Sequence, residues 1–214
     1  MLKSGKVDNN SPLLQVILAA MKKKFLFIPL IASLFFLSSS SSLDRVEAPT
    51  YVNYGVPIAE LVPPPINAQN FSLLVQKSSY TLFLKYNGRI IKSYPCVFGS
   101  NPVTDKMKQG DMCTPEGNFT IIDIREHFIW GYFMEFDYPN HESWEKYSLA
   151  RTNGLVNELD DIGGDVGIHG VVDGLESFID NKNNWTEGCV SMKNADLIDL
   201  ATNLAPGTPV KIVY

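Results

Sequence analysis

From residue 71 onward the chain contains short apolar runs whose alternation with polar residues is typical of strands with one buried face. The first runs are FSLLVQK, TLFLKY and RIIKSYPCVFG, which together occupy most of residues 71–99. Asn87-Gly88 separates the second run from the third, and this dipeptide is the strongest short signal for a two-residue hairpin. NFTIIDI, YFMEFDY and TPVKIVY predict further strands, and DVGIHG is a short apolar run that ends at a histidine.

Two segments favour helices rather than strands. Residues 141–151 place Trp144, Tyr147 and Leu149 near a helical spacing, and residues 195–204 follow Asn194, a residue type that often caps a helix. No internal repeat is present. The sequence therefore predicts a mainly β (α+β) fold with two or three short helices.

The first 69 residues are not predicted to be part of this fold. Residues 1–42 combine an upstream extension with a basic stretch, the apolar run FLFIPLIASLFFL and five serines, as in a secretory signal peptide. Residues 43–69 are proline-rich and show no helical or strand period, so we interpret them as a linker. The catalytic or binding domain is predicted to span residues 70–214, exported to the periplasm or cell envelope, with membrane contact only through an uncleaved signal segment.

Composition agrees with one exported domain. The 214 residues are 45% hydrophobic and 19% charged, which suffices for a single core. Without residues 1–42, which hold five lysines and one aspartate, 13 basic and 22 acidic residues remain, a formal charge of 13 − 22 = −9. Nucleic-acid binders carry clustered lysine and arginine, so this acidic domain argues against a nucleic-acid partner.

Three cysteines leave at least one without an intrachain disulfide partner. Cys96 and Cys113 lie in the same half of the domain, and Cys189 lies far downstream beside Gly188. The simplest prediction is a Cys96–Cys113 disulfide, with Cys189 as a free thiol. The alternative is that Cys96 and Cys113 are also reduced.

Cys189 and His169 are the candidates for nucleophilic chemistry. His169 ends an apolar run and precedes Gly170, and Cys189 follows Gly188 at the entry to the segment before the last predicted helix. An imidazole beside a thiol takes its proton and later returns it to a leaving amine. The alternative is that Cys189 is a small buried residue and His169 a hydrogen-bonded core histidine.

Four segments in order resemble the L,D-transpeptidase catalytic domain family (YkuD-like). The stretches IHG and WTEGCVSMKNADL resemble its histidine-glycine and Ser/Thr-x-Gly-Cys signature, and GDMCTPEGNFTI resembles its upstream Thr-Pro-x-Gly-x-Phe segment. FDYPN and GGDVGIHG are similar to the subgroup related to YafK. The resemblance covers about residues 71–214 and implies the L,D-transpeptidase-type β-sandwich or barrel-like fold.

The resemblance also implies residue roles. Cys189 is the nucleophile, His169 its general base and acid, and the Gly188 and Cys189 amides form the oxyanion hole. Gly170 and Thr186 match positions that shape the site.

Other positions near the motif stay open. Trp185, Glu187 and Ser191 are candidates for substrate contact, but many family members have histidine in place of Glu187 and arginine or asparagine in place of Ser191. These departures put in doubt a contact to a substrate carboxylate. Asp165, Asp173 or a backbone carbonyl would orient the imidazole.

The implied substrate is the stem peptide of bacterial peptidoglycan, cut through a thioester at the L-centre of a third-position diamino acid. An amine resolves the thioester in a transpeptidase, either from a second stem or from a wall-anchored protein. The alternatives are a hydrolase of the L,D-carboxypeptidase or amidase type, acting on peptidoglycan or peptidoglycan-linked protein, and a non-catalytic wall-binding module. No cofactor or metal is implied, and the sequence lacks zinc-site spacing.

Overall fold

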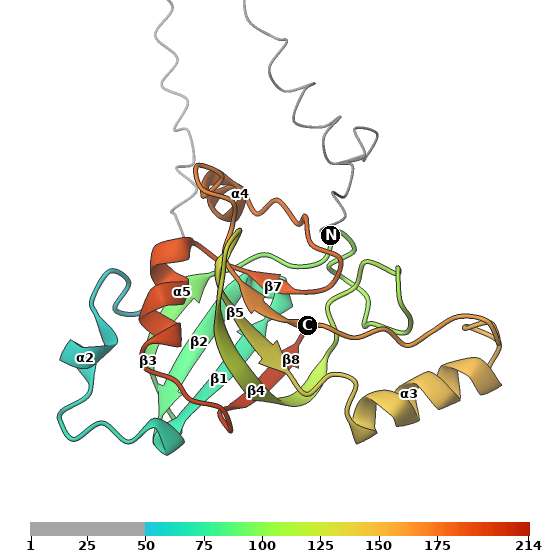
Figure 1. Ribbon diagram of the computed structural model, residues 1–214, viewed down its shortest axis with the longest axis horizontal. Coiled ribbons are helices and arrows are strands. Elements are labelled where there is room, and N and C mark those ends of the chain that lie inside the picture. Colours follow the sequence, from blue (N-terminus) through green and yellow to red (C-terminus); the bar gives the residue numbers. More distant parts are fainter. Residues whose placement is uncertain (1–49) are drawn as a thin grey trace, which may run out of the picture. The chain divides into compact units, whose positions relative to one another are not determined.

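Eight strands form one sheet in the computed structural model, which describes residues 50–214 (Figure 1). Their order across the sheet is β3-β2-β1-β8-β4-β5-β6-β7. The β1–β8 and β6–β7 pairs are parallel and the other neighbours are antiparallel. The strands are β1 (Phe71–Gln76), β2 (Thr81–Tyr86), β3 (Arg89–Pro95), β4 (Gly117–His127), β5 (Gly131–Phe136), β6 (Gly167–His169), β7 (Val190–Ser191) and β8 (Pro209–Val213).

The predicted hairpin between β2 and β3 is confirmed. Tyr86 pairs with Arg89, which leaves only Asn87 and Gly88 in the turn. Both turn residues have positive φ, 50° and 76°, as a type I′ turn requires. In β1 buried residues alternate with half-buried ones, so the period-2 pattern of FSLLVQ is the pattern of its burial.

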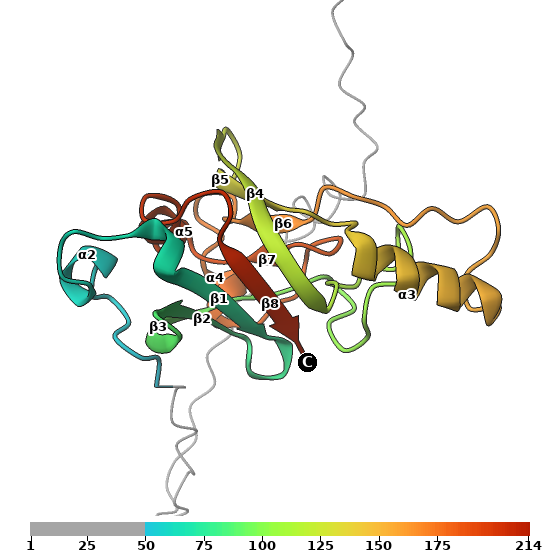
Figure 2. The same ribbon diagram turned by 90° about the horizontal axis from the view of Figure 1, so that it is seen from below.

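Strand β4 joins the two halves of the sheet because it is long enough to pair with different partners along its length. Residues 117–120 pair with β8, and the part from Ile121 to His127 pairs with β5 (Figure 2). The β4–β5 hairpin then leads to β6 and β7 at the far edge. Both residues proposed for chemistry lie at this edge. His169 is the last residue of β6, and Cys189 directly precedes β7.

Within residues 50–214, four short α-helices accompany the sheet, one more than the largest number predicted. They are α2 (Ile58–Leu61), α3 (His141–Thr152), α4 (Ser177–Asp180) and α5 (Asn194–Ala201), with 3₁₀ turns η1 (Ala68–Asn70) and η2 (Lys77–Ser79). Helix α5 packs on β5 and β6, whereas α3 projects from the side of the sheet (Figures 1 and 2). The helix predicted at residues 141–151 is confirmed. None of the helices in residues 50–214 is long and apolar enough to cross a membrane.

The last helix starts one residue earlier than predicted, and its cap prediction is wrong. The N-cap residue is Lys193, without a side-chain cap hydrogen bond, and Asn194 is the first helical residue. The Asn194 side chain instead accepts a hydrogen bond from the Val171 backbone N–H at 2.9 Å and donates to Asp173 at 3.0 Å. Asn194 therefore ties the helix to the segment after His169 rather than capping it.

The linker interpretation of residues 43–69 is wrong for its central part. Ile58 and Val62, 0% and 2% exposed, lie in the main hydrophobic core. The backbone N–H of Val52 donates to Ser93 Oγ at 2.8 Å, and that of Ile58 donates to Asp199 Oδ1 at 3.1 Å. Two apolar anchors and specific hydrogen bonds thus hold this proline-rich segment against β3 and α5. The predicted signal segment at residues 1–42 lies outside the described residues.

Candidate active site

The parallel ladder between β6 and β7 brings the two candidate residues to the same edge of the sheet. Ile168 pairs with Val190, and His169 pairs with Ser191. Cys189 directly precedes β7. Its thiol is hydrogen-bonded by the Gly167 backbone at the start of β6, so it lies beside the strand that carries His169.

The His169 ring is buried and oriented by a backbone carbonyl. Its Nδ1 lies 2.7 Å from Gly170 O, an arrangement in which Nδ1–H donates and Nε2 keeps a free lone pair. This leaves the carbonyl, rather than Asp165 or Asp173, as the orienting group. His169 is 2% exposed, and burial lowers its pKa to about 4, against the hydrogen bond to Gly170, which raises it. The ring is therefore neutral at pH 7, the form that accepts a proton.

Aromatic side chains enclose the His169 ring. Trp130 stacks on it with ring centroids 4.3 Å apart, Phe133 lies parallel at 6.3 Å, and Trp185 meets it edge-on at 5.4 Å. The His127 ring stacks on Trp130, with ring centroids 4.3 Å apart. Sequence reasoning missed Trp130, which comes from the turn between β4 and β5; the aromatic cluster HFIWGY at that turn was the available signal.

Gly170 is required because two elements meet at its α-carbon. A Cβ there would lie 2.1 Å from Asn194 Oδ1 and 2.5 Å from Trp130 O. Its own N–H donates to Trp130 O at 3.2 Å. The glycine thus lets the turn that holds Trp130 approach closely enough for the indole to stack on His169.

Cys189 is a neutral thiol in the resting structure. Burial raises its pKa to about 11, although a hydrogen bond from the Gly167 backbone and the charge of Lys106 lower it. Asp165 and Glu187 add negative charges that raise it further. The sulfur lies 3.6 Å from Asp165 O. The thiol and the imidazole are therefore both neutral at pH 7.

Thr186 and Gly188 fix the backbone at Cys189. The Thr186 hydroxyl donates to Cys189 O at 2.7 Å and accepts from the Gly188 N–H at 3.2 Å. Gly188 has φ 148°, a conformation that side chains rarely adopt. Of the two amides predicted for an oxyanion hole, the Gly188 N–H already donates to Thr186, whereas the Cys189 N–H has no acceptor among residues 50–214.

The three candidates for substrate contact differ in position. Glu187 is exposed and Trp185 is half-buried, with its indole N–H buried and without an acceptor in the described part of the chain. Ser191 is 0% exposed, and its hydroxyl donates to Gly170 O at 3.2 Å. The prediction that Ser191 contacts substrate is therefore wrong, because its side chain supports the strand that carries His169.

The predicted Cys96–Cys113 disulfide is not formed, and all three cysteines are free. Cys96 is fully buried in the main core, where burial raises its pKa above the ordinary thiol range. The Cys113 sulfur instead lies 3.1 Å from Thr104 Oγ1 and 3.3 Å from Asp111 O. Proximity in the sequence misled the prediction, because the two side chains face different surroundings. No group of three His, Cys, Asp or Glu side chains suited to a metal occurs within residues 50–214.

Comparison with known proteins identifies the family. The model of the YkuD L,D-transpeptidase catalytic domain matches residues 70–212. The chain belongs to the L,D-transpeptidase catalytic domain family. The match begins where the catalytic domain was predicted to begin, although the packed structure extends upstream to α2. No curated protein matches the chain.

Solved structures with a similar arrangement include three bacterial proteins. Bd1075 of Bdellovibrio bacteriovorus has TM-score 0.47 and 21% identity, covering 67% of this chain and 48% of that one. The helical cell shape determining protein Pgp2 of Campylobacter jejuni has TM-score 0.48 and 23% identity, covering 66% and 46%. L,D-transpeptidase 1 of Mycobacterium tuberculosis has TM-score 0.42 and 12% identity, covering 68% and 62%. The chain thus spans about half the length of Bd1075 and Pgp2.

Proposed function

We propose that this protein is a cysteine acyltransferase that acts on peptidoglycan stem peptides in the periplasm or cell envelope. The proposal is supported by the β6–β7 pairing, in which β6 ends at His169 and β7 begins directly after Cys189. Membership of the L,D-transpeptidase catalytic domain family supports the substrate class. Export through the segment at residues 1–42 is part of the same proposal.

The first half-reaction forms a thioester. His169 Nε2 takes the Cys189 proton while the sulfur attacks the carbonyl carbon at the L-centre of the third-position diamino acid. The carbonyl oxygen becomes an oxyanion beside the free Cys189 N–H, and the Gly188 N–H joins it if Thr186 releases that donor. Collapse of the tetrahedral intermediate breaks the peptide bond, and His169 returns the proton to the amine of the departing D-alanine.

The second half-reaction resolves the thioester. An amine attacks the thioester carbonyl, His169 accepts its proton, and the Cys189 thiol is restored as the new amide forms. An amine of a second stem gives a 3-3 crosslink, and an amine of a wall-anchored protein gives a protein linkage. Water in place of the amine gives a trimmed stem, which is the hydrolase alternative.

Product analysis separates these outcomes. The purified protein is incubated with a tetrapeptide stem alone and with a second stem as acceptor, and the products are identified by liquid chromatography and mass spectrometry. We expect a crosslinked dimer and free D-alanine from the wild type, none from Cys189→Ala, and retained activity in Cys96→Ala, which also removes one thiol. If the wild type released tripeptide and formed no dimer, the protein would be a hydrolase rather than a transpeptidase. If the wild type formed no product, the result would favour a wall-binding module.

A further inference from the structure

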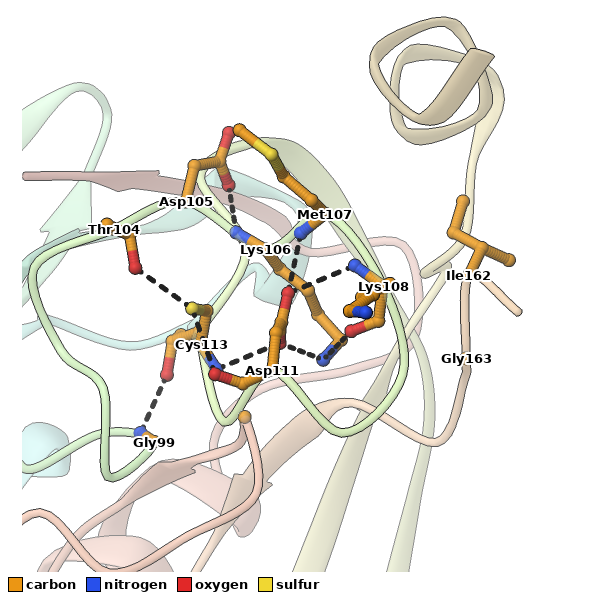
Figure 3. Close-up of polar contacts among 12 residues, drawn as sticks. Gly99, Thr104, Asp105, Lys106, Met107, Lys108, Asp111, Cys113, Ile162 and Gly163 are labelled. Atoms are coloured by element: carbon orange, nitrogen blue, oxygen red, sulfur yellow. Dashed lines mark hydrogen bonds and ion pairs between the residues drawn. The ribbon is translucent and has the colours of Figure 1, made fainter. Parts of the chain in front are cut away.

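A buried lysine lies next to the nucleophile motif in the loop of residues 104–113, here called the Lys106 loop. The Lys106 side chain is 4% exposed, and its Nζ donates to Asp111 Oδ1 at 2.9 Å and to Lys108 O at 3.1 Å (Figure 3). A buried ammonium group is costly unless it is paired, so this position is maintained by specific contacts. An ammonium has three N–H donors, and these contacts occupy two of them.

Asp111 holds the ammonium and the loop together. Its Oδ2 accepts from the Met107 and Lys108 N–H groups at 2.7 and 3.0 Å, and its Oδ1 accepts from the Cys113 N–H at 3.0 Å (Figure 3). Burial favours the protonated acid, but these hydrogen bonds and that from Lys106 outweigh it and lower the pKa of Asp111. The carboxylate is thus ionised, and it links Lys106 to three backbone N–H groups of the loop.

The Lys106 loop contacts the catalytic motif at Gly188. A Cβ built on Gly188 would lie 2.8 Å from Cys113 O and 3.6 Å from Lys106 Nζ. The absence of a side chain at Gly188 therefore lets the loop and its ammonium approach the backbone that precedes Cys189. A larger residue at this position would separate them.

Charge around Cys189 is otherwise unfavourable to a thiolate. Asp165 and Glu187 both raise the pKa of Cys189, as does burial, and the His169 ring is neutral. Lys106 is the positive charge that lowers it. The buried hydroxyl of Ser191 supplies no charge.

We propose that Lys106 is the electrostatic partner of the nucleophile, stabilising the negative charge on the Cys189 sulfur and on the oxyanion beside Gly188. The inference rests on the proposed function for the identity of the reaction. Its test needs no substrate, so a failure of the Lys106 proposal and a failure of the proposed function can be distinguished.

The test is the pH profile of Cys189 alkylation by iodoacetamide, followed on the peptide that contains Cys189. An opposite charge near a thiol lowers its pKa by about one unit or more. We expect Lys106→Met to shift the profile upward and to slow alkylation roughly three- to tenfold at a fixed pH below the pKa, since a higher pKa partly compensates through nucleophilicity. Lys106→Arg keeps the charge and should keep most of the rate.

Lys77→Met is the matched control. Lys77 is also buried, 1% exposed, and its Nζ holds the same part of the chain through Thr104 O, Thr114 O and Glu116. A loss of this lysine perturbs the loop without removing the charge at Gly188, so its alkylation profile should match the wild type. An equal shift in Lys77→Met and Lys106→Met would overturn the proposal in favour of a structural role.

A double variant tests whether Lys106 serves only its ion pair. Lys106→Met combined with Asp111→Asn removes both charges, and we expect it to alkylate as slowly as Lys106→Met alone. Recovery of the wild-type profile would show that the single variant acted through unpaired Asp111, which overturns the proposal. An unchanged profile in Lys106→Met together with a higher KM for the stem peptide would assign Lys106 to a substrate carboxylate instead, which also overturns it.

Discussion

The buried ring of His169 predicts a pH dependence of folding stability that one substitution removes. Burial lowers the pKa of His169 from 6.5 to about 4. Between these values the unfolded chain binds a proton at this residue and the folded chain does not, so the free energy of unfolding decreases as pH decreases. The contribution is complete above pH 6.5 and is lost as pH falls to about 4.

The separation of the two pKa values, 6.5 and about 4, corresponds to roughly 3 kcal/mol, most of which is lost between about pH 7 and pH 4.5. Urea unfolding at a series of pH values measures this loss. We expect the wild type to lose roughly 2 to 3 kcal/mol more than His169→Gln over this interval, because glutamine does not titrate. Other titrating groups contribute equally to both proteins and cancel in the difference.

His141→Gln is the control for this experiment. The His141 side chain is 89% exposed, so its replacement removes a histidine without changing a buried ring. We expect its pH dependence to follow the wild type. If His169→Gln also followed the wild type, the ring would titrate in the folded protein as it does in water, and the account of a neutral buried base would be wrong.

Three further substitutions test the packing around the site. Ile58→Ala should lower the free energy of unfolding by about 2 to 5 kcal/mol, because the side chain is fully buried in the core; a loss near zero in chemical denaturation would restore the linker interpretation. Gly170→Ala should cost at least about 1 to 3 kcal/mol and abolish stem-peptide cleavage, because the added methyl would lie 2.1 Å from Asn194 Oδ1; normal turnover would contradict the close approach. Thr186→Val should lower the rate of thioester formation about tenfold at unchanged KM, since the hydroxyl positions the Cys189 backbone; a change in KM alone would contradict this role.

Local patterns in the sequence predicted most of the sheet and the long helix. β-rich runs located β1 and β2, alternation located β4, and the requirement for positive φ made Asn87-Gly88 a reliable turn. Strand β7 has only two residues, which is too short for any period to appear. The helix α4 has four residues and was missed for the same reason.

Tertiary contacts account for the remaining errors. Ile58 and Val62 sit among prolines in a segment without a period, yet they reach the core because α5 and β3 provide partners for the backbone beside them. Cys96 and Cys113 are close in sequence, but one lies in the core and the other in the Lys106 loop. Neither arrangement can be predicted from local sequence patterns, because both depend on contacts between segments that are far apart in the chain.

Some residues of the candidate site could be predicted from the sequence, and others could not. Cys189, His169 and the glycines beside them follow from a motif, and the ladder between β6 and β7 explains why the motif brings them together. Trp130 and Lys106 come from a hairpin turn and a distant loop. Their contributions depend on cross-strand pairing and loop packing, which no local spacing encodes.

Intact-protein mass spectrometry during turnover tests the central claim most directly, since that claim is a covalent intermediate on Cys189. The protein is mixed with a tetrapeptide stem, quenched in acid and weighed, alongside Cys189→Ala and His169→Gln. The account predicts a mass increase equal to the stem minus D-alanine on the wild type, located on Cys189, absent from Cys189→Ala and strongly reduced in His169→Gln. Release of D-alanine by Cys189→Ala at the wild-type rate, or an adduct on another residue, would contradict it.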